Sequence, residues 1–476
     1  MNQKIKNHRV KFKDYRLLIV LLLTSFISVY FIPAILNRMI FLVILVAAFR
    51  TKLDYVYLVW FFIINDAPGF LFASGAFDSK RIPLYPVTGG ISISFQDLFL
   101  ILYIIKFVRL KNPPKLIFKK EFTWFLIYGF FVVVYSFLLG MDLNNIVKTF
   151  RFFLSWSLIF IIPAYVYNKE ILVRTSLLLF PMVFLAFASQ ILCYITGYFP
   201  ESYLNTIEVQ HMKVGKGITS RFYSAVTIIL FSIIQALIFF FHQKHEINKN
   251  YLGVVIFIGL FSIMLTATRG WVIALSILLL GVLVIFGFSK QIIGWFRLAI
   301  VSAIIFWIAV YQAPILQQQL VGSYQRLSTL EALVQGDMTA GGTLKRIDIR
   351  GPRVMRKFWE SPLVGWGFSN DYYRYQDYHV GHHTILLNVG ILGYVFINGL
   401  FASLCIKIWG IARKKEIRIY EGNTPLIYIL GLIAVFVVHS SSTQFWGYSL
   451  GIDKILFLSF LFAAANSVLL YRNRSD

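Results

Sequence analysis

Long apolar runs separated by shorter polar segments make up most of this chain. An α-helix crosses the hydrocarbon core of a bilayer with about 20 mostly apolar residues, so runs of this length predict membrane spans. The pattern predicts an all-α, polytopic helical bundle of about 12–14 spans. The expected spans lie near residues 17–34, 38–49, 53–66, 93–109, 122–140, 150–167, 172–196, 219–241, 251–267, 270–288, 292–311, 383–406, 425–441 and 453–471. For the second, third and fourth, which are short or carry an acid, a re-entrant or interfacial course is the alternative.

The polar connections differ in charge, and this difference predicts an orientation. If the basic N-terminus is cytoplasmic, 27 of the 45 Lys and Arg residues fall on the cytoplasmic side and 18 on the other. This excess has the sign that membrane insertion favours, so both termini are expected in the cytoplasm. Residues 1–311 are then the first part of the bundle, residues 312–382 a large extracytoplasmic loop, and residues 383–476 the C-terminal spans. In the loop, "RVMRKFWE" after Gly351-Pro352 predicts a short helix, because proline suits the first helical turn.

Composition agrees with this picture and narrows the partners. Of the 476 residues, 58% are hydrophobic and 14% charged, and the mean hydropathy is +0.73. Soluble globular domains have about 45–50% apolar and about 25% charged residues, so the chain is expected to be a membrane protein. The net charge of +24 would favour nucleic acid if the protein were soluble. Here much of it is the usual Lys and Arg excess of cytoplasmic loops, so membrane lipid, and not nucleic acid, is the expected partner.

Several arginines fall on the expected outer side, where positive charge near span ends is disfavoured. They are Arg221, Arg269, Arg346, Arg350, Arg353 and Arg356. A planar guanidinium group matches two phosphate oxygens, so arginines converging from different segments would bind an anion with more than one phosphate, such as a lipid pyrophosphate. The alternative for each is a side chain that reaches lipid headgroups or pairs with a nearby acid. Arg269 fits that alternative least, because the short turn Thr268-Arg269-Gly270 has no acid nearby in sequence.

A second candidate group lies in "YHVGHHTILLNVGILGYVFING", residues 378–399. His382 and His383 stand where the loop ends and a span begins. An imidazole can exchange a proton near neutral pH, so either histidine is a candidate general base for activating a hydroxyl. The alternative is an interfacial histidine at a helix start. Gly390 and Gly393 are a small-residue pair that predicts close helix packing.

Other chemistry is sparse in the sequence. Asp66 and Asp97 lie near outer span ends, where they would bind a cation or pair with an arginine. The chain has no Gly-rich phosphate loop with a lysine and no HExxH, CxxC or GxSxG pattern. No metal site, no nucleotide and no other cofactor is therefore expected.

Several weak motifs occur in a fixed order over residues 215–400. They are Arg221 opening a span, Thr268-Arg269-Gly270 joining the next two, Arg346 opening a loop helix that leads to "SPLVGWGF", and His382 followed by Leu386 and Gly393. In this order and spacing they resemble the bacterial O-antigen ligases and repeat-unit polymerases, which act on glycans linked to undecaprenyl diphosphate. The chain departs from that family in two places: His383 replaces an asparagine, and Gly351-Pro352 is expected to break the loop helix.

The resemblance implies an activity and roles for these residues. It implies a metal-independent, inverting glycosyltransferase of the bacterial cytoplasmic (inner) membrane, acting at the extracytoplasmic face in surface polysaccharide assembly. The donor would be an undecaprenyl-diphosphate-linked glycan, and the acceptor a sugar hydroxyl of a lipid-A core or of a growing glycan. The pyrophosphate would be bound by Arg221, Arg269, Arg346 and Arg350. His382 or His383 would be the catalytic base.

Two choices about the activity stay open at this point: ligase or polymerase, and enzyme or transporter. A ligase and a polymerase share this chemistry and differ in the acceptor, so the motifs do not separate them. The rival from another class is a flippase or transporter of the same lipid, which predicts internal symmetry and charges near the membrane midplane. No internal repeat is evident, and the charges concentrate at span ends and in one outer loop, which favours an enzyme at the surface.

Overall fold

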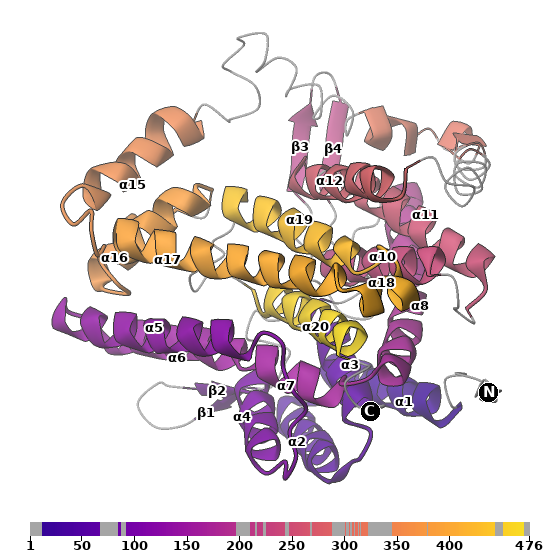
Figure 1. The fold of residues 1–476 in the computed structure, drawn as a ribbon, viewed down its shortest axis with the longest axis horizontal. Helices are drawn as coiled ribbons and strands as arrows, with labels where there is room; N and C mark the ends of the chain where they lie inside the picture. Colours follow the sequence, from indigo (N-terminus) through magenta and orange to yellow (C-terminus); the bar gives the residue numbers. More distant parts are fainter. Residues whose placement is uncertain are drawn as a thin grey trace.

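The computed structural model describes residues 12–66, 84–86, 92–196, 210–214, 217–221, 225–242, 247–266, 269–287, 300, 304, 307–308, 310–312, 314, 316–321, 345–377, 379–442 and 451–470. Regular structure in this part is almost entirely helical, which confirms the predicted all-α architecture (Figure 1). In chain order the elements are α1 (Phe12–Phe31), α2 (Ala34–Arg50), α3 (Asp54–Asn65), β1 (Leu84–Pro86), β2 (Ser92–Ser94), α4 (Phe95–Val108), α5 (Lys119–Leu138), α6 (Leu143–Trp156), α7 (Leu158–Tyr165), α8 (Lys169–Thr196), β3 (Gln210–Val214), β4 (Gly217–Arg221), α10 (Val226–Phe241), α11 (Lys249–Leu265), α12 (Arg269–Phe286), the π-helix η2 (Lys345–Arg350), α15 (Gly351–Phe358), α16 (Asn370–Tyr375), α17 (Gly381–Ala412), α18 (Lys415–Glu421), α19 (Leu426–Ser442) and α20 (Ile452–Leu469).

Six helices in the described part of the chain are long and apolar enough to cross a membrane. They are α1, α5, α6 with α7, α8, α17 and α20. A seventh span would consist of α18 and the first part of α19, which meet at 88°. Four further helices, α3, α10, α11 and α12, are apolar but shorter. The chain is therefore a multi-pass membrane protein, and the full number of its spans stays a prediction.

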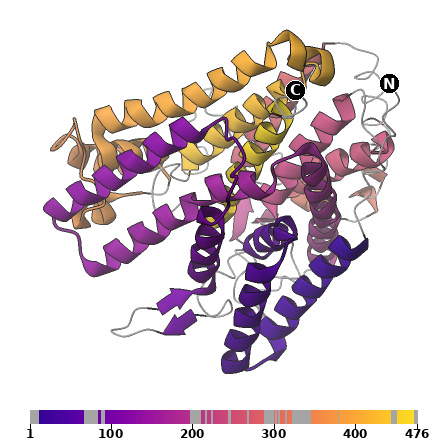
Figure 2. The ribbon, with the colours of Figure 1, turned by 60° about the horizontal axis from the view of Figure 1, so that its bottom comes forward.

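The centre of the bundle consists of helices that are apolar on every side. All 16 residues of α10 are buried, and so are all 12 of α3. A helix that is hydrophobic all round is stable in a globular bundle only when every face is covered. By contrast, α5 and α17 run side by side (Figures 1 and 2). Both carry large exposed apolar side chains, such as Phe130, Phe131, Val395 and Ile406. In a membrane protein these faces contact lipid, because acyl chains are as apolar as the side chains.

Lysines within the apolar helices are paired with carboxylates from other helices. The pairs are Lys106–Asp54, Lys407–Glu121 (2.8 Å) and Lys169–Glu421 (2.9 Å). A buried charge is tolerated in such surroundings when an opposite charge compensates its lost hydration. These pairs therefore explain how the bundle accommodates polar residues in spans that are otherwise apolar.

The prediction that residues 219–241 form one span, opened by Arg221, is wrong at its start. Residues 217–221 form β4, which pairs antiparallel with β3, and Arg221 ends that strand opposite Gln210. The helix begins only at Val226. Its first turn is capped by Asp66, whose carboxylate accepts hydrogen bonds from Ile228 N (2.9 Å) and Thr227 Oγ1 (2.5 Å). A cap from a residue so distant in the sequence cannot be seen in the segment itself.

Two other predicted boundaries can be compared with the structure. The division of residues 251–288 into two helices is confirmed, because α11 ends at Leu265 and α12 begins at Arg269. The span expected to begin near residue 150 begins instead at Leu143, where Asp142 accepts a hydrogen bond from Asn145 N at 2.8 Å. Most of the predicted span 292–311 lies outside the described residues, and so does the middle of the predicted loop 312–382.

Candidate functional site

Helix α17 is broken at Gly390, and the loop between α15 and α16 binds into the break. Gly390 has φ +64° and ψ −173°, which breaks the two bonds that a continuous helix would make, from Ile391 N to Leu387 O and from Leu392 N to Asn388 O. The loop residues 361–368, here named the docked loop, supply four replacement hydrogen bonds. These are Ile391 N to Pro362 O (2.9 Å), Leu392 N to Leu363 O (3.1 Å), Trp366 N to Leu387 O (2.8 Å) and Gly367 N to Asn388 O (2.7 Å). These two N–H groups and two carbonyl groups are therefore all satisfied by one segment.

Glycines make this close approach of two backbones feasible. A Cβ on Gly365, at φ +71°, would lie 2.5 Å from Gly390 N, and one on Gly390 would lie 2.2 Å from Leu363 O. The Pro-Leu-x-Gly-x-Gly motif and Gly390 thus serve one geometric requirement. Gly393 allows a second close contact, since a Cβ there would lie 1.9 Å from the Tyr128 hydroxyl of α5. The predicted close helix packing is confirmed at Gly393, against α5, whereas Gly390 packs against the docked loop and not against a helix.

The break also determines where His382 lies. His382 Nδ1 is hydrogen-bonded to the Tyr394 hydroxyl at 2.8 Å, and its ring lies 5.8 Å from that of Phe436 on α19. In an unbroken helix, residues twelve apart would be separated by about 18 Å along the axis, too far for these two side chains to meet. His382 and His383 are both half-buried. Tyr394 and Phe436 hold the first imidazole in place.

Asp377 joins the arginines of η2 and α15 to the start of α17. Its carboxylate lies 3.6 Å from Arg350 Nη1 and 3.2 Å from Arg353 Nη2. Its backbone N–H donates to Thr384 Oγ1 at 3.2 Å, and the Thr384 hydroxyl donates to the Asp377 carbonyl at 2.9 Å. Because Thr384 directly follows His383, Asp377 brings both guanidinium groups to the helix end that carries the histidines. Both arginines pair with a local acid, and their side chains remain 36% and 51% exposed.

The predicted break of the loop helix at Gly351-Pro352 is wrong. The backbone stays helical through Arg350 (φ −75°, ψ −46°), so η2 leads directly into α15. Pro352 has no N–H to give to the preceding turn, and that turn is wider than an α-helical one. The short helix predicted after Gly351-Pro352 is confirmed, and its apolar residues Val354 and Phe358 are buried.

Lys357 of α15 has a structural role in this region. Its Nζ lies 2.7 Å from Glu360, 2.8 Å from Asp371 and 3.7 Å from the ring centre of Trp366 in the docked loop. Burial would lower the pKa of Lys357, but the hydrogen bonds and charges of Asp371 and Glu360 outweigh it and raise the pKa. The ammonium group therefore holds α15, α16 and the docked loop together.

The relative direction of α12 and α19 places the start of α12 near the end of α19 at which His382 lies. Asn423 Nδ2, just before α19, donates to the carbonyl of Ile285 near the end of α12 at 3.4 Å, so the two helices are antiparallel. Arg269 begins α12 and thus lies toward the C-terminal end of α19. That is also the end where Phe436 contacts His382. The side chains of Arg269, Arg221 and Arg346 lie outside the described residues, so their contacts stay predictions.

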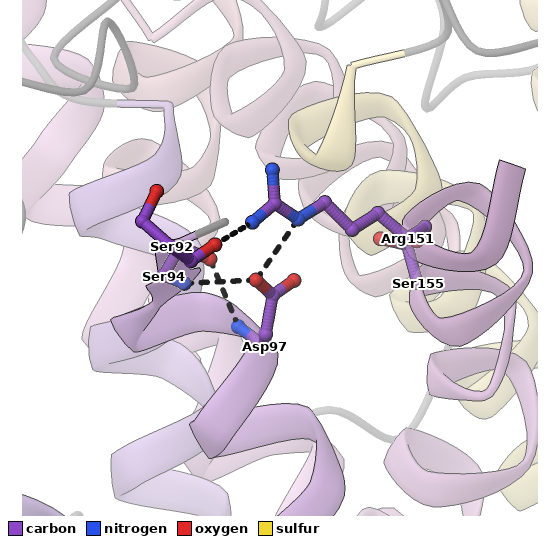
Figure 3. Close-up of polar contacts among 5 residues, drawn as sticks. All are labelled: Ser92, Ser94, Asp97, Arg151 and Ser155. Atoms are coloured by element: carbon purple, nitrogen blue, oxygen red, sulfur yellow. Dashed lines mark hydrogen bonds and ion pairs between the residues drawn. The ribbon is translucent and has the colours of Figure 1, made fainter. Parts of the chain in front are cut away.

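Asp97, expected to bind a cation or an arginine, pairs with Arg151 (Figure 3). Arg151 Nε lies 3.0 Å from Asp97 Oδ2, and another guanidinium nitrogen donates to the Ser92 carbonyl. The same carboxylate accepts from Ser94 N at 2.9 Å, while Ser94 Oγ accepts from Asp97 N at 3.1 Å, a capping box at the start of α4. Asp97 therefore has structural partners on all sides. The described residues hold no cluster of three or more His, Cys, Asp or Glu with metal-site geometry.

Sequence reasoning missed Asp377 and Tyr394. Neither has a motif of its own, and Tyr394 reaches His382 only because of the break at Gly390. The one available signal was Gly390 itself, a glycine inside a long apolar run.

The chain is similar in sequence to a curated protein. No family model matches the chain. The ComP-specific O-oligosaccharyltransferase of Acinetobacter baylyi (strain ATCC 33305 / BD413 / ADP1) is 22% identical over 234 residues, which are 47% of this chain and 38% of the relative. The similarity supports the resemblance to the O-antigen ligases that the motifs indicate. The matched part is thus well under half of the length of that relative.

A structural comparison adds a distant likeness. A chain from a structure titled "Structural coordination of polymerization and crosslinking by a peptidoglycan synthase complex" is 13% identical, and the match covers 74% of this chain and 98% of that one. The TM-score is 0.39, which is too low to bear on fold or function.

Proposed function

We propose that this chain is a membrane glycosyltransferase of the O-antigen ligase or polymerase type. It transfers a glycan from undecaprenyl diphosphate to an acceptor sugar hydroxyl at the extracytoplasmic face of the bacterial cytoplasmic membrane. The ordered motifs and the similarity to an O-oligosaccharyltransferase support this class of activity. A ligase and a polymerase would catalyse the same transfer and would differ only in the acceptor.

One observation carries the proposal: cationic side chains and an oriented imidazole occur at the same end of α17. Asp377 binds Arg350 and Arg353 and is hydrogen-bonded to Thr384, beside the histidines. Arg269 begins α12 at the corresponding end of α19. An extracytoplasmic site with several guanidinium groups suits the two phosphates of a polyprenyl diphosphate. Arg221, Arg269, Arg346 and Arg350 are the proposed pyrophosphate ligands.

His382 is the proposed general base. Its Nδ1 lies 2.8 Å from the Tyr394 hydroxyl, so Nδ1 can carry the hydrogen and donate it to Tyr394 Oη. This tautomer leaves the Nε2 lone pair available to accept a proton. Tyr394 thus orients the base, as a carboxylate or carbonyl does in other histidine sites.

The chemical step is an in-line displacement at the anomeric carbon. His382 Nε2 removes the proton of the acceptor hydroxyl, and that oxygen attacks the anomeric carbon from the side opposite the pyrophosphate. The bond from the anomeric carbon to the pyrophosphate oxygen breaks, and its electron pair leaves with polyprenyl diphosphate. The arginines stabilise the negative charge that develops on this leaving group, which is electrostatic stabilisation of the transition state. Attack from the opposite side inverts the anomeric configuration.

The test is transfer of a labelled lipid-linked oligosaccharide by the purified protein in nanodiscs. His382→Gln is expected to lower the rate about 10²–10⁴-fold, as loss of a general base does. His383→Gln, its direct neighbour, is expected to change the rate less than about tenfold. Arg269→Ala is expected to lose about 10²–10³-fold, as loss of a transition-state hydrogen-bond donor does.

Arg374→Ala is the matched control for the arginine variant, because Arg374 is an exposed arginine of α16 that stacks only on Tyr375 among the described residues. It is expected to transfer at the normal rate. Near-normal transfer by both His382→Gln and Arg269→Ala would overturn the proposal. The acceptor that supports transfer, a lipid-A core or a second repeat unit, separates ligase from polymerase.

A further inference from the structure

An apolar surface that the proposed activity does not use lies on the loop after α15 and on the adjoining residues of α17. Trp359 is 65% exposed, Leu363 61% and Leu392 62%, and Val364 and Ile391 are also exposed. We name these five residues the apolar tip. Large apolar side chains gathered on a surface mark a place where another molecule binds.

The apolar tip is held rigidly against the end of a helix. Leu392 N donates to Leu363 O at 3.1 Å, and Ile391 N donates to Pro362 O at 2.9 Å. On the other side of the loop, the indole N–H of Trp366 donates to the Lys357 carbonyl at 3.0 Å. The exposed side chains are therefore presented by a fixed backbone and do not collapse onto the protein.

The position of the apolar tip along α17 identifies the chemistry of its partner. The second part of α17 runs from Ile391 to Ala412 and is about 33 Å long, close to the roughly 30 Å hydrocarbon core of a bilayer. Its exposed apolar side chains continue from Leu392 through Val395 and Ile406 to Trp409. The apolar tip is thus continuous with the lipid-facing side of a membrane span, at the end where that span begins.

The charges next to the apolar tip are one paired acid and two exposed arginines. Glu360, which follows Trp359, is paired with Lys357 at 2.7 Å. Arg353 and Arg356 are exposed on α15, while Val354 and Phe358 on the same helix are buried against the protein. Exposed arginines one or two turns from the apolar tip would contact lipid phosphates. Trp359 is the residue of the apolar tip that follows these arginines most closely in the sequence, and tryptophan is enriched at membrane interfaces.

We infer that the apolar tip is a membrane anchor, immersed in the acyl chains of the leaflet at which α17 begins. The anchor holds α15 and its arginines at the level of the lipid headgroups. Its partner is bilayer lipid, because the surface is continuous with a lipid-facing helix side and is flanked by exposed arginines.

The test measures the depth of single nitroxide labels in nanodiscs of phosphatidylethanolamine and phosphatidylglycerol. Cys193 and Cys405 are first replaced by serine, and a cysteine is then introduced by Leu363→Cys or, as the control, by Arg356→Cys on the exposed side of α15. The label at 363 is expected to collide at least about threefold more often with oxygen, which concentrates in lipid, than with a water-soluble nickel chelate. The label at 356 is expected to show the reverse preference.

Two results would overturn the inference. Equal access of the nickel chelate to labels 363 and 356 would place the apolar tip in water. Shielding of label 363 from both reagents would indicate a protein partner instead of lipid. Neither measurement uses glycan transfer, so failure of the anchor and failure of the proposed function can be told apart.

Discussion

Replacement of Gly390 by alanine is expected to detach the docked loop from α17. At φ +64° and ψ −173°, Gly390 occupies a backbone region open essentially to glycine alone, where a side chain costs about 1–3 kcal/mol. The new Cβ would also lie 2.2 Å from the carbonyl oxygen of Leu363. That atom belongs to the backbone and cannot rotate away. The variant avoids the backbone strain and the overlap with Leu363 only if the docked loop detaches from α17.

The magnitude follows from the contacts that undocking removes. Four backbone hydrogen bonds join the loop to the break, and each contributes about 0.5–1.5 kcal/mol net. Undocking therefore costs about 2–6 kcal/mol, and retaining the strained, overlapping geometry costs a similar amount. The expected loss is at least about 2 kcal/mol, which is about a 30-fold change in the opening equilibrium.

Hydrogen exchange measured by mass spectrometry on the protein in nanodiscs reports this opening directly. In Gly390→Ala, amides of residues 361–368 are expected to exchange about 30-fold faster than in the parent protein. Gly399→Ala is the matched control, because Gly399 lies in the same helix and a Cβ there would meet nothing within 4 Å. Equal protection of the docked loop in the two variants would show that the conformation of Gly390 does not hold the loop in the break.

Three further substitutions test other contacts of the region. Lys357→Met removes the cation shared by two carboxylates and should destabilise the protein by about 1–3 kcal/mol, whereas Arg356→Met should change the thermal midpoint little. Because partner charges raise the pKa of Lys357, its contribution should persist through neutral pH and disappear only above about pH 10.5. Gly393→Ala should lower the thermal midpoint, and adding Tyr128→Phe should restore part of it, since the Tyr128 hydroxyl is the nearest of the groups that a Cβ would overlap. No rescue would count against that contact. Asp377→Asn should increase hydrogen exchange of η2 and α15 several-fold; unchanged exchange there would show that the carboxylate is dispensable.

Local sequence signals predicted these helices because the residues that determine each helix lie within its own segment. The apolar runs give the bundle, the turn before Arg269 separates α11 from α12, and Gly351-Pro352 begins α15. Each of these elements has its hydrophobic period or its helix-start residues within its own segment.

Features that depend on distant contacts could not be predicted in the same way. The break at Gly390 exists because a loop more than twenty residues earlier supplies its hydrogen bonds. The late start of α10 depends on Asp66, and the place of His382 depends on Tyr394 beyond the break. In each case a tertiary contact, and not local propensity, decides the local conformation.

The candidate site was predicted partly by residue type and partly by resemblance. Arginine and histidine chemistry singled out Arg350 and His382, and the structure brings their helices together. That Asp377 joins the two helices could not be predicted, because a lone acid in a loop has many equivalent interpretations.

The most direct test of the account is a cryo-electron microscopy structure of the protein in nanodiscs with bound undecaprenyl diphosphate. Diphosphate density is expected in contact with Arg269 and with the guanidinium groups near the start of α17, on the same side of the membrane as His382. Diphosphate density at the opposite end of α17, near Lys407 and Glu121, would contradict it.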